Sequence, residues 1–340
     1  MVSAGRGVAP CTQGPGAAAG VNALADNAGS ALQVTRLAVD QAGRAADFLR
    51  TRGGGVMDLL AHFWDRLAQT PPLLRDDVHL LLAGPGAAGA AGADSASVLG
   101  AMLYVPKGHR ADVFITDASA GRAFTSYLAD WVQRQPRVER SEPPPAGTPE
   151  TTVPAALALN YVTGEATSVQ QMLPGLLELV HRKNAAKQSV NVMMRLPPDR
   201  PVRRCAKVRA ARDGDEAVLN KWRRLYRKER GILFEADVDA WIDTGNVFVY
   251  ELEGQVAAVA KFDLMLRAIV EIGGVFTFPD FRRRGIGAEL VSELVGRIRE
   301  SGKTPSLQVD TEHHPALAMY RKGGWVEIGR LARVWLSNAP

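Results

Sequence analysis

The sequence predicts a protein of the α/β class (α+β, with a mixed sheet) and two domains. Three observations support this fold class. The chain has 340 residues, more than a single hydrophobic core usually serves. Short apolar runs typical of strands alternate with segments of helical spacing along most of the chain. Adjacent prolines in residues 197–201 stop either kind of element and predict a linker. We therefore expect a first α/β domain over 31–196 and a second over 202–340.

Composition indicates a globular protein and argues against several other classes. Hydrophobic residues make up 46% and charged residues 23%, which are ordinary values. Residues 1–30 are rich in Gly, Ala, Ser and Pro, and predict a disordered tail. The two cysteines, Cys11 and Cys205, lack disulfide or metal-ligand spacing, so we expect a cytoplasmic protein without a metal.

Membrane and nucleic-acid partners are not expected. No apolar run reaches the roughly 18 residues that a transmembrane helix needs. Lys plus Arg exceeds Asp plus Glu by 41 − 36 = 5 charges, without the dense basic face that reads nucleic acid. This mild surplus suits a small anionic ligand.

In the first domain, the clearest predicted element is a β-hairpin. Two apolar runs, 98–105 and 113–117, flank the turn-like Pro106-Lys107-Gly108. The predicted elements that follow it are a helix at 121–132, a strand at 157–162, a helix at 169–182 and a strand at 190–196.

The second domain is predicted to start with a helix that Asp213 caps and to end with a strand or hairpin. Between them we expect a short helix, a hairpin turning at Glu253-Gly254, a third strand, and then a helix, a strand and a helix. The expected ranges are 213–229, 237–242, 246–252, 256–266, 268–278, 285–301, 306–310, 315–321 and 325–336.

One segment of the second domain carries a ligand-binding pattern. Strand residues from Glu271 run into a turn with the spacing Arg282-x-x-Gly285-x-Gly287, directly before a predicted helix. A helix N-terminus offers unpaired N–H groups to a pyrophosphate, and the glycines allow the backbone to approach it. The spacing fits neither a dinucleotide-binding Gly-x-Gly-x-x-Gly nor a P-loop.

This pattern resembles the acetyl-CoA motif of the GNAT acetyltransferase superfamily, including Pro279 just before it. A second family pattern, Asn-x-x-Ala-x-x-x-Tyr-x-x-x-Gly-Phe, is matched by Ala316, Tyr320, Gly324 and Trp325, with His313 in place of the Asn. The resemblance covers about 135 residues and implies a GNAT fold for the second domain.

The resemblance also implies roles for individual residues. Val275, Phe276 and Thr277 would pair their backbone with the pantetheine arm of acetyl-CoA. The turn would hold the pyrophosphate through Arg282, Arg283, Arg284, Gly285, Ile286, Gly287 and Ala288, with His313 and Tyr320 also beside the cofactor.

Acetyl transfer to an amine needs a general base and a general acid. The candidates are Glu271 as base and Tyr320 as acid. Strand alternation predicts that Glu271 shares a face with Gly273, Val275 and Thr277, and the two neighbouring glycines predict close approach of a ligand. Weaker candidates are His314, Tyr226, Glu229 and Cys205, for which packing or solvent exposure is the simpler explanation.

Several alternatives stay open on the sequence alone. The chain resembles two-part bacterial GNAT proteins, so the first domain is either a degenerate GNAT relative or an unrelated α/β domain. The predicted function is transfer of an acetyl group from acetyl-CoA to a primary amine of a small molecule, peptide or protein. The alternative is an acetyl-CoA-binding sensor that transfers nothing. A homodimer is compatible with either function.

Overall fold

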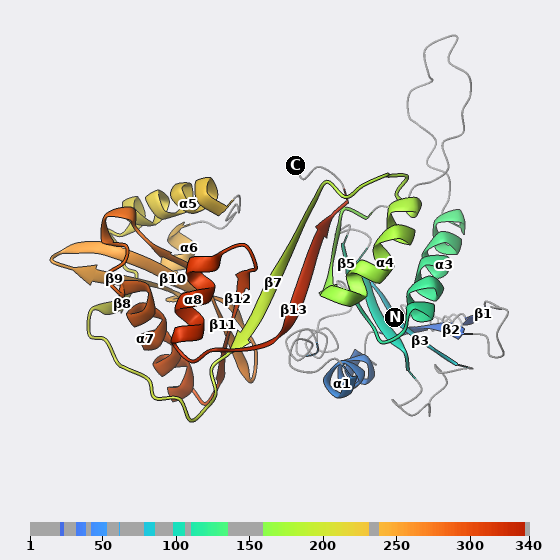
Figure 1. Ribbon diagram of the computed structural model, residues 1–340, viewed down its shortest axis with the longest axis horizontal. Helices are drawn as coiled ribbons and strands as arrows, with labels where there is room; N and C mark the ends of the chain where they lie inside the picture. The colour runs from blue at the N-terminus through green and yellow to red at the C-terminus, as the bar shows by residue number, and fades with distance from the viewer. Residues whose placement is uncertain are drawn as a thin grey trace, which may run out of the picture.

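The computed structural model describes residues 21–23, 32–38, 42–52, 61, 78–85, 98–105, 110–134, 159–230 and 238–336. Two lobes lie side by side, and two long strands run between them (Figure 1). The thirteen strands of the described residues form one mixed sheet, in the order β1-β2-β3-β4-β5-β6-β13-β7-β12-β11-β10-β9-β8. The fold class predicted from the sequence, mixed α/β, is confirmed.

The strands divide into two sets along the chain. Those of the N-terminal half are β1 Val21–Ala23, β2 Leu32–Leu37, β3 His79–Pro85, β4 Gly100–Val105, β5 Arg110–Ile115, β6 Tyr161–Glu165 and β7 Lys187–Arg195. Those of the C-terminal half are β8 Val208–Ala210, β9 Val247–Leu252, β10 Gln255–Met265, β11 Ile269–Thr277, β12 Thr304–Asp310 and β13 Val326–Trp335.

Helices cover both faces of the sheet in each half. They are α1 Ala42–Arg52, α3 Ala118–Arg134, α4 Ala166–Leu179, α5 Glu216–Arg230, α6 Val238–Asp243, α7 Ile286–Glu300 and α8 His314–Lys322. In the C-terminal half, the apolar side of α7 (Leu290, Leu294, Ile298) packs on one face, and α5 with α6 packs Trp222 on the other. None of the helices in the described ranges is long and apolar enough to span a bilayer.

The two halves repeat one order of elements. In each half, one strand and at least one helix come before three antiparallel strands. A helix then leads to a strand that runs parallel to the third of these strands. The parallel pairs are β5 with β6 and β11 with β12. A further helix and a closing strand, β7 or β13, complete each half. This repetition favours the degenerate-relative alternative for the first half.

The closing strands are exchanged between the halves. β7 follows the N-terminal elements, yet it pairs with β12, while β13 pairs with β6. Core packing follows the same exchange, since Val192 and Met194 of β7 belong to the C-terminal core and Ala332 and Val334 of β13 to the N-terminal one. The boundary predicted at 197–201 therefore divides the chain but not the sheet, and independent domains stay a prediction.

Three local expectations need correction or comment. Helix α5 starts at Glu216, because the Asp215 backbone carbonyl accepts the first helical N–H bond, from Leu219; Asp213 is not the cap. The Asp215 carboxylate pairs instead with Arg209 of β8 at 2.7 Å, which ties the helix start to the sheet. Of the predicted tail, residues 21–23 pair with β2, and the rest lies outside the described residues. The last element is one strand and not a hairpin.

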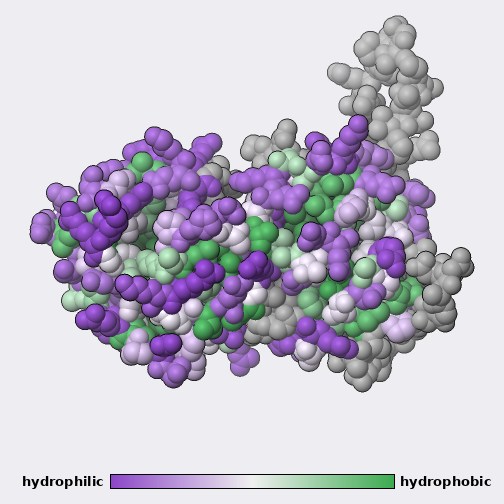
Figure 2. Space-filling view, in the orientation of Figure 1, coloured by the Kyte–Doolittle hydropathy of each residue, from purple (hydrophilic) through white to green (hydrophobic). Residues whose placement is uncertain are grey.

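Hydrophilic residues cover most of the visible face, and hydrophobic patches surface mainly near the middle of the molecule and on the N-terminal lobe (Figure 2). The buried apolar side chains form clusters on the two faces of the sheet. This distribution is that of a folded α/β protein with a packed interior.

Candidate functional site

Strands β11 and β12 separate at the point where the motif begins. They pair in parallel only from Ile269–Thr304 to Ile272–Leu307. Beyond this point β12 stays paired with β7, while β11 continues to Thr277 with β10 on its other side. Among the described residues, no strand pairs with the other edge of 273–277, so backbone N–H and C=O groups of 273–276 are available to an extended ligand.

A bulge at Gly274 changes which side chains share a face of β11. Val259 of β10 lies opposite Phe276, but Lys261 lies opposite Gly273, so β11 has one extra residue in between, and Gly274 has φ +61°. The predicted alternation through Gly273, Val275 and Thr277 is therefore wrong. Phe276 packs with the α5 side, whereas Val275 packs against the cluster that contains α7.

The two glycines of β11 make room for side chains of the protein. A Cβ at Gly273 would overlap the Asp263 carboxylate, and one at Gly274 would lie 2.8 Å from the Trp222 ring. These contacts give the glycines a packing role within the protein, and the approach of a ligand to them stays a prediction. Their small size instead lets Asp263 lie against the strand close to Glu271.

The turn before α7 has the geometry of an anion site. Gly285 is the N-cap with φ +80°, and no side chain caps the helix. A Cβ at Gly287 would lie 3.2 Å from Thr277 Oγ1 and 3.4 Å from Met319 Sδ, so α7 starts in close contact with β11 and α8. The first N–H groups and the positive end of the helix dipole thus face the opening beside β11.

The three arginines of the turn have different surroundings. Arg282 donates through Nε to Thr277 O at 2.9 Å and pairs with Glu229 at 2.8 Å, and its guanidinium lies 5.2 Å from the Phe276 ring centre. It therefore ties the turn to β11 and α5. All three arginines are exposed, but Arg282 is held by Glu229, so Arg283, at φ +63°, and Arg284, over the Phe281 ring, are better placed to meet phosphate charge.

Glu271 is a buried carboxyl group in the middle of the sheet. Its side chain is 8% exposed, and Oε2 accepts a hydrogen bond from Gln308 Nε2 at 2.8 Å. Burial, reinforced by the negative charge of Asp263, raises the pKa of Glu271 to about 7, while Gln308, Arg333 and Lys261 act to lower it. A carboxyl group with this pKa has the properties of a general base near neutral pH.

Tyr320 lies on α8 in a buried position, with its ring 6.0 Å from that of Trp325. Burial, and then the nearby Tyr226, raise its pKa above the usual range, so the phenol is protonated at neutral pH. His313 is the N-cap residue of α8, where its backbone carbonyl accepts from Ala316 and Leu317 while its side chain caps nothing.

The weaker candidates have structural contacts. Tyr226 packs edge-on against Trp222 and at a tilt against Phe276, and burial raises its pKa. Glu229 is the partner of Arg282. Cys205 donates its backbone N–H to Glu293, and His314 begins α8 as an exposed residue.

Polar residues that sequence reasoning missed surround Glu271. Gln308, Arg333 and Asn191 are joined by hydrogen bonds across β12, β13 and β7, and Lys261 forms an ion pair with Asp263 on β10. One signal was present: Ser306, Gln308 and Asp310 alternate along β12 and mark a polar face.

The corresponding opening in the N-terminal half is closed. The parallel pairing of β5 and β6 ends at Val113–Gly164, but Ser168 Oγ then bonds both the N–H and the C=O of Ile115, at 3.0 and 3.2 Å. The Asp117 carboxylate accepts from the Ser119 N–H at 2.7 Å, so an anion of the protein already occupies the start of α3. Gly121 serves packing, since a Cβ there would press on Met172 and Ile115.

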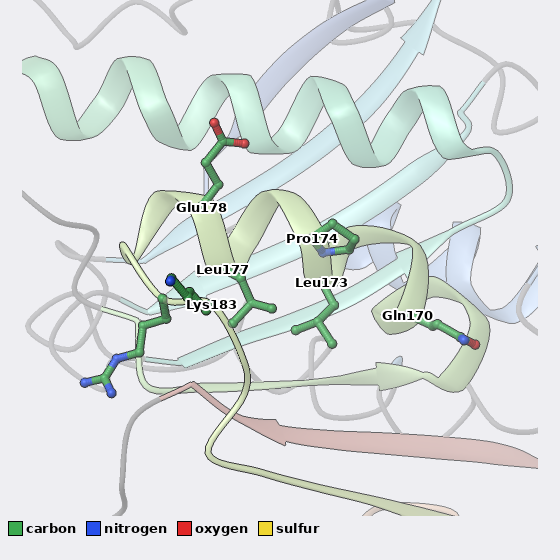
Figure 3. Close-up of a pocket in the computed structure, with 7 residues that line it drawn as sticks. Gln170, Leu173, Pro174, Leu177, Glu178 and Lys183 are labelled. Atoms are coloured by element: carbon green, nitrogen blue, oxygen red, sulfur yellow. The ribbon is translucent and has the colours of Figure 1, made fainter.

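A cavity of about 570 Å³ opens elsewhere, on α4 of the N-terminal half. Leu173 and Leu177 point to the same side of this helix, with Lys183 near them (Figure 3). None of the predicted site residues lines it. Within the described residues, no group of three or more His, Cys, Asp or Glu is arranged to hold a metal ion.

Comparison with known proteins finds similarity to acetyltransferases by sequence. Residues 216–325 match the family model described as Acetyltransferase (GNAT) family. The uncharacterized N-acetyltransferase MJ1207 of Methanocaldococcus jannaschii is 29% identical over 123 residues, which cover 34% of this chain and 50% of that protein. The chain thus spans about half the length of this relative.

Solved structures extend the likeness in fold to nearly the whole chain. A GCN5-related N-acetyltransferase from Sphaerobacter thermophilus matches with a TM-score of 0.53 at 15% identity, covering 91% of this chain and 97% of its own. A Drosophila protein matches with a TM-score of 0.54 at 12% identity, covering 90% and 99%. At these identities the likeness concerns the fold alone.

Proposed function

We propose that the protein transfers an acetyl group from acetyl-CoA to a primary amine, in the opening between β11 and β12; the match of residues 216–325 to the GNAT acetyltransferase family model supports this. The observation that carries this proposal is the juxtaposition of three features. Three features border this opening. They are the buried Glu271, whose pKa is about 7, the edge of β11 that pairs with no other described strand, and the start of α7, which no side chain caps. Together they supply a base, an amide-pairing edge and an anion site.

The residues present fit acetyl-CoA. The free edge of Val275–Thr277 suits the amides of the pantetheine arm. The N–H groups after Gly285 suit the pyrophosphate, and the positive φ of Gly285 turns the chain without a Cβ in the way. Arg283 and Arg284 add charge from exposed positions, and His313 lies at the start of the neighbouring helix.

The chemistry requires proton movement at two atoms. Bound acetyl-CoA supplies an activated thioester carbonyl for an amine to attack. Glu271 accepts a proton from the ammonium or amine nitrogen of the acceptor, directly or through one water. Tyr320 holds a proton on its hydroxyl at neutral pH and donates it to the departing sulfur. The packed aromatic rings of Tyr226, Phe276 and Trp222 limit the access of water from the α5 side.

An amine-acceptor screen tests this function. The full chain is incubated with acetyl-CoA and a panel of small amines, amino acids and peptides, and products heavier by one acetyl group are sought by mass spectrometry. At least one amine is expected to be acetylated. If acetyl-CoA binds by calorimetry but no amine is modified, the protein is a binding module.

The variant Gly287→Glu tests whether acetyl-CoA binds at the start of α7. A side chain there meets Thr277 and Met319 and places a negative charge at the pyrophosphate site. We expect it to abolish acetyl-CoA binding. Gly43→Glu, in the open on α1, makes the same chemical change in the other half and should bind as the parent does. Equal affinity in both variants, with the fold intact by circular dichroism, would remove α7 from the cofactor site.

A further inference from the structure

A chain of hydrogen bonds crosses four neighbouring strands and ends at Glu271. Gln308 of β12 donates through Nε2 to Glu271 Oε2 at 2.8 Å. The other end of the same amide, Oε1, accepts from Arg333 of β13 at 2.7 Å and from Asn191 of β7 at 3.4 Å. Asn191 and Glu271 are each 8% exposed, so the chain runs through the interior of the sheet.

The chemistry of Arg333 decides which way the Gln308 amide points. A guanidinium group only donates hydrogen bonds, so the atom of Gln308 that faces it must be the carbonyl oxygen. The NH₂ group then faces Glu271 and can only donate. If the amide were flipped, its oxygen would face the Glu271 carboxylate and its NH₂ group would face the guanidinium. The hydrogen bonds to Glu271 and to Arg333 would then both be lost. Arg333 therefore selects the orientation that favours the ionised form of Glu271.

Charged groups reach Glu271 from several elements. Asp263 and Lys261 face it from β10, and Arg333 faces it from β13. On α5, Tyr226 lies within electrostatic reach of Asp263, Arg333 and Arg230. Gln308, which carries no charge, donates a hydrogen bond directly to the Glu271 carboxylate, at 2.8 Å.

We propose that Gln308 is a positioning residue for the base Glu271, and that Arg333 and Asn191 hold its amide in the donating orientation. The proposal rests on the function proposed above in taking Glu271 as the base. It gives the exchange of closing strands a role, because Asn191 lies on β7, a strand supplied by the N-terminal half. The transfer site of the C-terminal half is thus completed by the rest of the chain.

A titration of Glu271 tests the proposal without an acceptor. The full chain is labelled with glutamate carrying ¹³C at the side-chain carboxyl, and Glu271→Gln identifies the resonance. Gln308→Met keeps the shape and removes both hydrogen-bonding ends. We expect it to raise the pKa of Glu271 by about one unit or more, the size of a hydrogen bond to a charged group.

Arg333 also acts through its charge, and a double-mutant cycle separates the two effects. Arg333→Met should raise the pKa of Glu271 strongly in the parent and by about half as much in the Gln308→Met background. Equal shifts in both backgrounds would show that Arg333 acts by charge alone and would overturn the proposal. Arg330→Met, which removes an exposed arginine paired with Glu327 on the same strand, is the control and should leave the pKa unchanged.

Asn191→Ala provides a second test that changes no charge. Any rise in the pKa of Glu271 must then come through the amide of Gln308, and we expect a small rise in the same direction. No rise in either Asn191→Ala or Gln308→Met, in protein folded by near-ultraviolet circular dichroism, would refute the positioning role. Failure of the proposed function is a separate result, since it would show as unchanged turnover in Glu271→Gln while the titration shifts persist.

Discussion

Replacing Glu271 with Gln should remove the acidic limb of the pH–rate profile. The pKa of about 7 means that roughly one tenth of Glu271 is ionised at about pH 6 and nine tenths at about pH 8. If Glu271 is the base, kcat/KM of the parent rises roughly tenfold over this range. Gln keeps the shape and can still accept from Gln308, so the variant should lose about 10² to 10⁴ in rate without losing its fold.

The assay follows release of free CoA thiol with an acceptor found in the screen. Titration of the acceptor amine affects parent and variant alike, so their ratio isolates the enzyme group. Glu327→Gln, which changes an exposed glutamate paired with Arg330, is the control and should retain the parent profile. If Glu271→Gln kept the acidic limb and the parent rate, the assignment of the base would be refuted.

The same pKa has a consequence for stability, with the sign set by proton binding. The folded protein holds the Glu271 proton up to about pH 7, whereas the unfolded chain releases it near the ordinary value of 4.5. Between these values the folded state binds more protons, so the free energy of unfolding falls as the pH rises. Relative to Glu271→Gln, the parent should lose up to about 3 kcal/mol across this window, measured by urea denaturation.

Three further perturbations test other parts of the structure. Tyr320→Phe keeps the packing on Trp325, so acetyl-CoA affinity should survive while single-turnover rates fall about 10²-fold; an unchanged rate would remove the acid role. Glu293→Gln weakens the buried partner of Arg204 and should lower the free energy of unfolding by about 2 kcal/mol in urea. The pKa of Glu293 is lowered to about 2, chiefly by Arg204, so this stabilisation is present above pH 4.5 and is lost as the pH falls toward 2. If the Glu293→Gln variant were as stable as the parent, the pairing would be contradicted. A fragment of residues 202–340 lacks β7 and leaves the edge of β12 open, so it should aggregate in light scattering where the full chain does not; equal behaviour would make β7 dispensable.

Local sequence patterns predicted the elements around the Gly285 turn because short-range interactions decide them. The hairpin of β9 and β10 turns at Glu253-Gly254, where both residues have positive φ. Helix α7 begins directly after Gly285, as the strand–glycine–helix pattern predicted. Neither feature depends on residues far away in the chain.

The errors at the site came from interactions that local patterns do not contain. Alternation failed at Gly274, because the Trp222 ring from α5 takes the space beside it and β11 bulges there. A bulge is the match of one strand to another, so it cannot be seen in one strand alone. Local patterns likewise did not show that the Asp263 side chain lies against Gly273 from β10.

The sequence by itself determined the residues that can carry the chemistry: a glutamate in a strand, a tyrosine in the last helix, and glycines at a helix start. Their types and spacing are local properties, written in about 50 consecutive positions from Glu271 to Tyr320. Only the tertiary structure decided what surrounds the glutamate. Gln308, Arg333 and Asn191 meet because β7 and β13 exchange places between the halves. Strand order depends on contacts between segments more than a hundred residues apart, whose apolar faces and hydrogen-bonding edges fit only once the whole sheet has formed.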